Sequence, residues 1–304
     1  MEFGKMFSSL DAHVAGEAYR IVTQSPILLS GTGLKAQSEQ LARNFSAEKN
    51  LLLNEPRGHR GMHGVIPVGS DRADIGLLFF SHRQASAFKY EGVLAAVGAL
   101  LETGGLKRRE NGRYTAETTE GVIELSADFN GDEVAQISVR NKAASVTRTS
   151  QSSTALLDGK RKYLIYPLPP AIPEIDLAHL SVISEWGAGK AAEYASATHA
   201  ITGVVLAEEL PGGGFRSVTF EKDGYILRSP GIDTTFALLA LQEKRNGNHA
   251  VSVSNTSIFG STLIAEAPDG EGGPALVRAE PFVTGAHQFV LDREDPLDQG
   301  FLIV

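Results

Sequence analysis

The stretch that decides the fold is IGLLFFSHRQASAFKYEGVLAAVGALLETGG, residues 75–105. It opens with IGLLFF, a continuous apolar run of the kind that forms a buried strand. After a polar connection an apolar stripe with helical spacing begins, and Gly104-Gly105 ends it. The stripe consists of Val93, Leu94, Val97, Leu100 and Leu101. The stretch therefore predicts a strand, a turn and an amphipathic helix.

A second stretch, residues 225–248, repeats this plan without repeating the residues. YILRS comes first, and IDTTFALLALQEKRNGN follows with an apolar helical face. Asp233 or Thr234 is the expected N-cap, since Asp and Thr are preferred there. The repeat is one of architecture only, and it predicts two similar lobes whose helix amino ends are available to one ligand.

Most of the remaining chain reads as short β-rich runs separated by glycine and polar turns. Asn130-Gly131 and Asp223-Gly224 each lie between two such runs and supply the positive φ of a tight hairpin. Antiparallel pairing is therefore expected. Residues 32–45, TGLKAQSEQLARNF, carry a thin apolar stripe and predict a surface helix.

The composition of the chain excludes several classes of partner and of functional site. The chain has 304 residues, is 42% hydrophobic and carries a net charge of -8 with no long charged block, so nucleic acid and anionic membranes are not expected partners. The amino end lacks the pattern of a signal peptide, and no stretch approaches a membrane span, so a cytoplasmic location is the expectation. Cysteine is absent, which excludes disulfides, thiolate metal sites and a cysteine nucleophile.

Several blocks, among them VGALLETGGL (97–106) at the end of the first predicted helix, resemble the proline racemase family, which includes hydroxyproline 2-epimerases and trans-3-hydroxyproline dehydratases. DAHVAGEAYRIV (11–22) is similar to the family's D-x-H-T-x-G-E-x-x-R-[IV]-V, and NEPRGHRGMHGVI (54–66) is similar to E-P-R-G-H-x-x-M-x-G. NTSIFGS (255–261) and VTGAHQFVLDREDPLDQGFLI (283–303) resemble the family's carboxyl-terminal segments. The blocks are scattered over the whole chain.

The resemblance implies an α/β (α+β) fold of two pseudo-symmetric lobes, similar to proline racemase and diaminopimelate epimerase. Each lobe is a curved, mainly antiparallel sheet around a central helix. Residues 1–125 form the expected N-terminal lobe and residues 126–280 the C-terminal lobe, and residues 281–304 return to the first. The family needs no cofactor or metal and uses one cysteine at each central helix, on opposite faces of a substrate α-carbon. A homodimer is an assembly that the sequence leaves open.

This chain departs from the family at those two positions. Its Phe88-Lys89-Tyr90-Glu91-Gly92 aligns with the family's M-C-G-H-[NG] loop, so lysine replaces cysteine and glutamate replaces histidine. In the second loop Gly231 takes the place of the other cysteine. A racemase that works with two thiols is therefore excluded.

Lys89 and Glu91 have two interpretations. A helix amino end and partial burial both disfavour an ammonium, so the pKa of Lys89 is expected to fall and Lys89 to act as a neutral base. Glu91 would then orient Lys89 or bind a substrate ammonium. In the other interpretation Lys89 is a solvated surface residue and Glu91 an ordinary charge at a helix start.

Asp233 is the candidate for a second acid or base, or an ordinary helix cap. The residues expected to bind substrate around these groups are Tyr90, Gly92, Gly231, Ile232, Thr234, Thr235 and His59. His59 and His63 are spaced four apart, but the flanking glycines oppose a helix and no third ligand is evident, so no metal is expected.

Two functions remain open. The first is a cofactor-independent enzyme, of the isomerase family or a related dehydratase, that acts at the α-carbon of a small, often cyclic, amino or hydroxy acid. Because Gly231 has no acid or base, a dehydratase, lyase or one-base isomerase fits better than a racemase. The alternative is an inactive relative that binds an amino-acid-like ligand or a protein partner.

Overall fold

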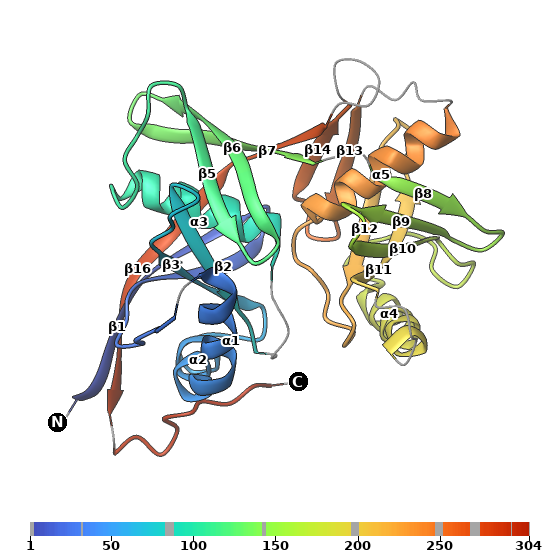
Figure 1. Ribbon diagram of the computed structural model, residues 1–304. Helices are drawn as coiled ribbons and strands as arrows, with labels where there is room; N and C mark the ends of the chain where they lie inside the picture. Colours follow the sequence, from blue (N-terminus) through green and yellow to red (C-terminus); the bar gives the residue numbers. More distant parts are fainter. Residues whose placement is uncertain are drawn as a thin grey trace. The chain divides into compact units, whose positions relative to one another are not determined.

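The computed structural model describes residues 3–31, 33–82, 88–141, 144–195, 201–246, 252–267, 274–292 and 294–303. The chain divides into two compact units (Figure 1). Unit 1 comprises Met1–Ser138 and Glu280–Val304, and unit 2 comprises Val139–Ala279. The division expected between residues 125 and 126 falls within a strand, whose hairpin continues the sheet of unit 1.

Unit 1 contains a sheet with the strand order β16-β1-β2-β3-β4-β5-β6-β7. The last strand, β16, pairs antiparallel with β1. The elements are β1 (Phe3–Val14), β2 (Glu17–Gln24), α1 (Leu34–Asn44), α2 (Ser46–Leu53), β3 (Met62–Val68), β4 (Ile75–Phe80), α3 (Tyr90–Glu102), β5 (Arg113–Thr118), β6 (Gly121–Asn130), β7 (Glu133–Asn141), whose end passes into unit 2, and β16 (Pro281–Asp292).

Unit 2 contains the strand order β15-β14-β13-β12-β11-β10-β9-β8. Its elements are β8 (Ser145–Arg148), β9 (Ser153–Leu157), β10 (Arg161–Pro167), α4 (Leu180–Ala195), β11 (Gly203–Glu209), β12 (Phe215–Phe220), α5 (Ile232–Arg245), β13 (Ser252–Ser257), β14 (Thr262–Glu266) and β15 (Ala275–Ala279).

The two units share one connection pattern. In unit 1 the pairs β2/β3 and β4/β5 are parallel, and the pairs around them are antiparallel. In unit 2 the parallel pairs are β10/β11 and β12/β13, again between antiparallel pairs. Helices make the crossovers that parallel pairs require. Hence α3 follows β4 as α5 follows β12, which confirms the predicted pseudo-symmetric α/β fold.

The helix α3 is the core of unit 1. It packs against β1, β2, β3 and β16, and every residue from Tyr90 to Leu100 is buried. The predicted amphipathic stripe was therefore too narrow, because the small residues between the large ones also contact strands. A Cβ on Gly98 would lie 2.3 Å from Cγ of Pro281, so glycine permits the close approach of β16.

The other predicted elements are mostly found. The helix expected at residues 32–45 is α1, and α5 occupies the second predicted helix. The Asn130-Gly131 hairpin joins β6 and β7, with Gly131 at φ 61°. The Asp223-Gly224 turn is present, but the chain after it makes one isolated bridge, Phe220 to Ile226, and no second strand.

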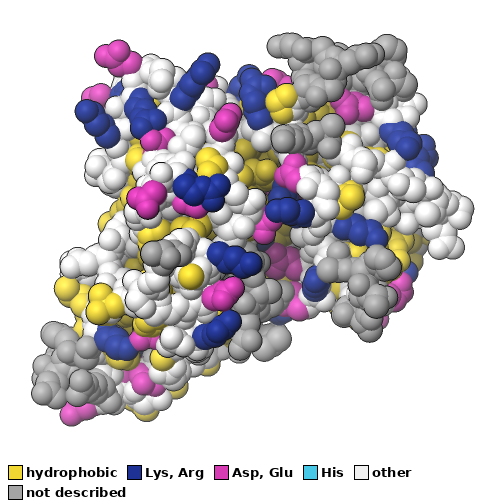
Figure 2. All heavy atoms as spheres, viewed as in Figure 1, with side chains coloured by type: hydrophobic (Ala, Val, Ile, Leu, Met, Phe, Trp, Pro, Cys, Tyr) yellow, Lys and Arg dark blue, Asp and Glu magenta, His cyan; other side chains and the backbone are white. Residues whose placement is uncertain are grey.

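The surface of the described residues carries both signs of charge. Figure 2 shows Lys and Arg side chains interspersed with Asp and Glu over the visible face. Among the described residues, no helix has the length and apolar character that crossing a membrane requires.

Candidate functional site

One group of candidate residues lies at the start of α3 in unit 1. Lys89 is the N-cap residue, in extended conformation at φ −145° and ψ 144°. The backbone N–H groups of Gly92 and Val93 donate to its carbonyl, which fixes the first turn. The first residue of the AFKYEGVL segment, Ala87, lies outside the described residues. The hydrogen bonds of the first turn of α3 therefore fix the position of the Lys89 backbone.

The side chain of Lys89 meets an acid and an imidazole. Its Nζ lies 3.2 Å from Oε1 of Glu17 and 3.2 Å from Nε2 of His63. His63 Nε2 and Glu17 Oε1 are 2.6 Å apart. The Lys89 side chain is 12% exposed and that of Glu17 is fully buried. The interpretation of Lys89 as a solvated surface residue is therefore wrong.

The strand register explains why these groups meet. In the parallel pair β2/β3, Tyr19 lies opposite His63, and their rings stack with centroids 5.3 Å apart. Glu17 precedes Tyr19 by two positions, so both side chains lie on the same face of β2. This face packs against α3, since a Cβ on Gly92 would lie 2.6 Å from Cε1 of Tyr19. We call Glu17, His63 and Lys89 the unit 1 cluster.

One carboxylate faces two basic groups in the unit 1 cluster. A buried carboxylate stabilises the protonated form of a neighbouring amine, so Glu17 opposes the effects of burial and of the α3 dipole on Lys89. Glu91, the carboxylate expected to orient Lys89, is buried in the first turn of α3.

A second, separately described group of candidate residues lies at the start of α5 in unit 2. Gly231 is the N-cap, so the expected caps Asp233 and Thr234 were wrong, and both lie in the first turn. The φ of Gly231 is +82°, in the left-handed region that favours glycine. A Cβ there would lie 2.9 Å from Oγ1 of Thr234. The backbone at this position therefore disfavours any side chain, cysteine included.

Asp233 is bound by a cation and a phenol. Arg161 donates from Nε to Oδ2 at 2.7 Å and from Nη2 to Oδ1 at 3.2 Å, and Tyr163 donates to Oδ2 at 2.9 Å. Arg161 also donates to Asp158 at 3.0 Å. Burial raises the pKa of Asp233, while the charge and hydrogen bonds of Arg161 and the Tyr163 hydroxyl act to lower it. Both oxygens of Asp233 are thus used inside unit 2.

Most of the residues expected to bind substrate contribute to the interior of the fold. Thr234 Oγ1 lies 2.8 Å from Oγ1 of Thr219, and Thr235 donates to the carbonyl of Gly231 at 2.7 Å. The side chains of Tyr90 and Ile232 are buried. Substrate contact through these residues stays a prediction.

His59 and Arg57 lie in the loop before β3 and make hydrogen bonds or ion pairs there. Nδ1 of His59 accepts a hydrogen bond from the N–H of Gly61 at 3.1 Å, and Nε2 of His82 lies 3.1 Å from the His59 carbonyl. Arg57 pairs with Asp295 at 2.6 Å. His59 is exposed, and its contact with substrate stays a prediction.

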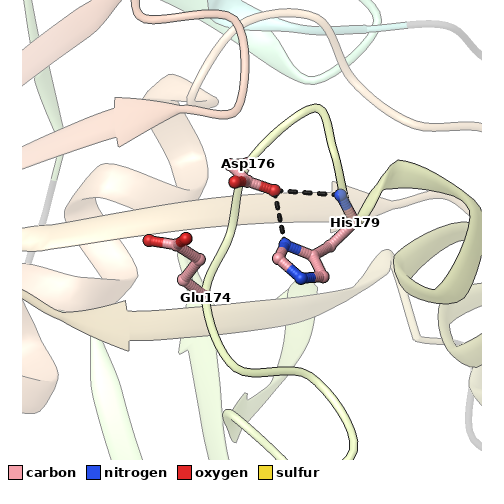
Figure 3. Close-up of side chains that lie close together, drawn as sticks. All are labelled: Glu174, Asp176 and His179. Carbon is pink, nitrogen blue, oxygen red and sulfur yellow. Dashed lines mark hydrogen bonds and ion pairs between the residues drawn. The ribbon is translucent and has the colours of Figure 1, made fainter.

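One group among the described residues has the composition of a metal site: Glu174, Asp176 and His179 (Figure 3). Oδ1 of Asp176 lies 2.6 Å from Nδ1 of His179 and accepts the backbone N–H of the same residue at 2.9 Å. These bonds lower the pKa of Asp176. They also hold the turn that precedes α4, which accounts for Asp176 and His179 without an ion.

Two members of the unit 1 cluster were not predicted as functional. Glu17 stands in the DAHVAGEAYRIV block, and His63 was considered only together with His59, as a pair not expected to bind a metal. The signal that would have found them is the register of β2 on β3, which no local pattern contains.

The comparisons with known proteins agree with one another. A model of the family described as "Proline racemase" matches residues 9–155. The trans-3-hydroxy-L-proline dehydratase of Bacillus thuringiensis is 29% identical over the full length of both chains. The proline racemase of Clostridioides difficile is 24% identical, also over the full length of both.

A solved structure extends the likeness to the fold. The hydroxyproline epimerase of Agrobacterium vitis, crystallised with trans-4-hydroxy-L-proline, superposes with a TM-score of 0.81 at 21% identity, covering 100% of this chain and 96% of that one. Sequence blocks, full-length relatives and fold agree, and the chain belongs to the proline racemase family.

Proposed function

We propose that this protein is a cofactor-independent enzyme that removes the α-proton of a small amino or hydroxy acid, with Lys89 as the base. The observation that carries the proposal is the unit 1 cluster. Nζ of Lys89 lies at the start of a central helix, with an acid and an imidazole each 3.2 Å away. Groups that hold and exchange protons are what abstraction next to a carboxylate needs. Lys89 acts in its neutral form, so turnover rises with pH as the ammonium loses its proton.

The second unit supports a one-base reaction. Racemisation needs a proton donor on each face of the α-carbon, whereas elimination needs one base and a leaving group. Gly231 has no ionisable side chain, and Asp233 is engaged by Arg161 and Tyr163. In our proposal the reaction therefore uses one base, Lys89.

The relatives suggest the reaction. Proteins named trans-3-hydroxy-L-proline dehydratase are 28–29% identical to this chain over its full length. By analogy, Lys89 takes the proton from C2 of a 3-hydroxy amino acid while the C3–O bond breaks. The hydroxide gains a proton and leaves as water, and the C2=C3 enamine tautomerises to an imine. We propose 3-hydroxyproline and related cyclic amino acids as the first substrates to test.

The test is exchange of the α-hydrogen in deuterated water, followed by NMR. The panel is proline, the 3- and 4-hydroxyprolines and a set of acyclic amino and hydroxy acids. We expect exchange or elimination with at least one of them, and a loss of about 10²-fold or more in Lys89→Met. Lys5→Met is the matched control, because Lys5 also pairs with a glutamate, Glu48, at a distant place in unit 1.

One observation favours the alternative of an inactive, ligand-binding relative. Both Lys89 and Asp233 take part in ion pairs within the protein. If substrates raise the melting temperature but cause neither exchange nor elimination, or if Lys89→Met turns over as fast as Lys5→Met, the enzyme proposal is wrong and the binding function replaces it.

A further inference from the structure

We propose that Lys89 has a second chemistry, which no thiol at this position has: its amine condenses with the carbonyl of a 2-oxo acid to form a Schiff base. This activity does not depend on the proposed α-proton abstraction. It rests on the position of Nζ, on its two neighbours and on the helix start that carries it.

The first argument is the environment of the amine. A reactive lysine needs to be partly shielded from water and to lie beside groups that exchange protons with it. The Lys89 side chain is 12% exposed, and the Glu17 side chain beside it is fully buried. Other lysines have one feature each: Lys49 is buried with Nζ 3.2 Å from the carbonyl of Ala42, and Lys5 pairs with Glu48 at a side-chain exposure of 41%.

The second argument is proton transfer. Addition of the amine gives a carbinolamine, which loses water only when its hydroxyl receives a proton. His63, whose Nε2 lies 3.2 Å from Nζ and 2.6 Å from Glu17, is placed to supply that proton. The product is a protonated imine. It replaces the ammonium as the partner of Glu17, so the buried carboxylate stabilises the charged, reactive form.

The third argument concerns the kind of carbonyl compound. The positive end of the α3 dipole lies where Lys89 begins the helix, and it favours an anion close to Nζ. A 2-oxo acid has its carboxylate one bond from the carbonyl carbon. It is therefore preferred over a neutral ketone of the same size.

The step balances without a further reactant. The nitrogen of the neutral amine forms a double bond to the carbonyl carbon. The carbonyl oxygen leaves as water with one hydrogen of the amine and the proton donated by His63, and the other amine hydrogen stays on the nitrogen of the protonated imine. In the trapping experiment, borohydride supplies the hydride that reduces the C=N bond to a secondary amine.

The experiment treats the full chain with pyruvate and borohydride at pH 8 and maps modified lysines by peptide mass spectrometry. We expect Lys89 to be labelled at least about tenfold faster than exposed Lys35 or buried Lys49, and acetone to label it more slowly than pyruvate. Glu17→Gln should speed labelling at this pH, because the ammonium loses its counter-charge. His63→Asn should slow it while leaving the melting temperature near that of the unmodified chain.

Equal labelling of Lys89 and Lys35 by pyruvate, or equal rates with acetone and pyruvate, would overturn the proposal. Lys89→Arg, which keeps the charge, guards against loss of folding and should remove the labelled peptide. Labelling without α-hydrogen exchange would leave the Schiff-base chemistry standing and reject the proposed function, and the reverse result would do the opposite.

Discussion

The starts of α3 and α5 occupy the same place in two units of the same topology, yet they differ in chemistry. At α3 an extended Lys89 reaches a buried acid and an imidazole. At α5 a glycine with φ +82° presents no side chain, and the nearest carboxylate is fixed by an arginine. The two helix starts are therefore not chemically equivalent, although the resemblance implies a cysteine at each in the family. The start of α3 has a side chain that can carry a proton, and the start of α5 has an N-cap without a side chain.

We expect the largest effect from breaking the ion pair between Arg161 and Asp233, which tests whether this pair stabilises the start of α5. Arg161→Met leaves Asp233 buried without its cation, which should lower the free energy of unfolding by about 3–5 kcal/mol at neutral pH. Urea denaturation measures the loss. Arg161→Met combined with Asp233→Asn is the control and should recover much of it. A single variant as stable as the unmodified chain would mean that the pair does not hold the start of α5.

The second prediction tests whether Lys89, at the start of α3, is the base whose protonation controls α-hydrogen exchange. Glu17→Gln removes the charge that stabilises the Lys89 ammonium, so α-hydrogen exchange should reach its plateau at lower pH. At a pH below the plateau, each unit by which the pKa of Lys89 falls raises the fraction of neutral amine about tenfold. The pH–rate profile of exchange is the measurement. A displacement to higher pH would show that Lys89 is not the titrating base.

A smaller effect concerns the glycine at α5. Gly231→Ala places a Cβ at positive φ and 2.9 Å from Thr234, so we expect a loss of about 1–3 kcal/mol in unfolding free energy. Gly189→Ala is a matched control, because nothing lies within 4 Å of a Cβ there. Equal stabilities of the two variants would show that the start of α5 tolerates a side chain, and Gly231→Cys would then deserve a racemase assay.

The smallest effect is a pH dependence. Since burial raises the pKa of Asp233, the folded chain binds more protons than the unfolded chain above pH 3.8, the ordinary pKa of Asp. The stability contribution of Asp233 should therefore fall as pH rises from 3.8 toward its folded pKa. Asp233→Asn should flatten the stability curve over that interval. An unchanged curve would place the pKa of Asp233 at its ordinary value.

The sequence predicted those elements whose signals lie within a short stretch of neighbouring residues. Apolar spacing and glycine ends located α3 and α5, because both signals are local. The helices α2 and α4 were missed. In α2 the buried Leu51, Leu52 and Leu53 are contiguous rather than periodic, and in α4 Gly187 lowers the helix propensity while packing against Phe220.

The residues of the unit 1 cluster likewise fall into one that local sequence identified and two that it did not. Lys89 was found from its position before a helix and from the family alignment. Glu17 and His63 join it through the parallel register of β2 and β3, with α1 and α2 between those strands in the chain. Local sequence does not specify such a pairing, so the cluster required the structure.

The resemblance implies that the amine of Lys89 stands at the start of α3 where the family has a thiol, and this difference changes which reagents can damage the site. A thiolate at a helix amino end is readily oxidised to sulfenic and then sulfinic acid, and alkylating reagents capture it. An amine beside Glu17 and His63 resists peroxide under the same conditions. The protein should withstand oxidants that inactivate a cysteine-dependent relative, and its corresponding weakness should be toward reactive aldehydes.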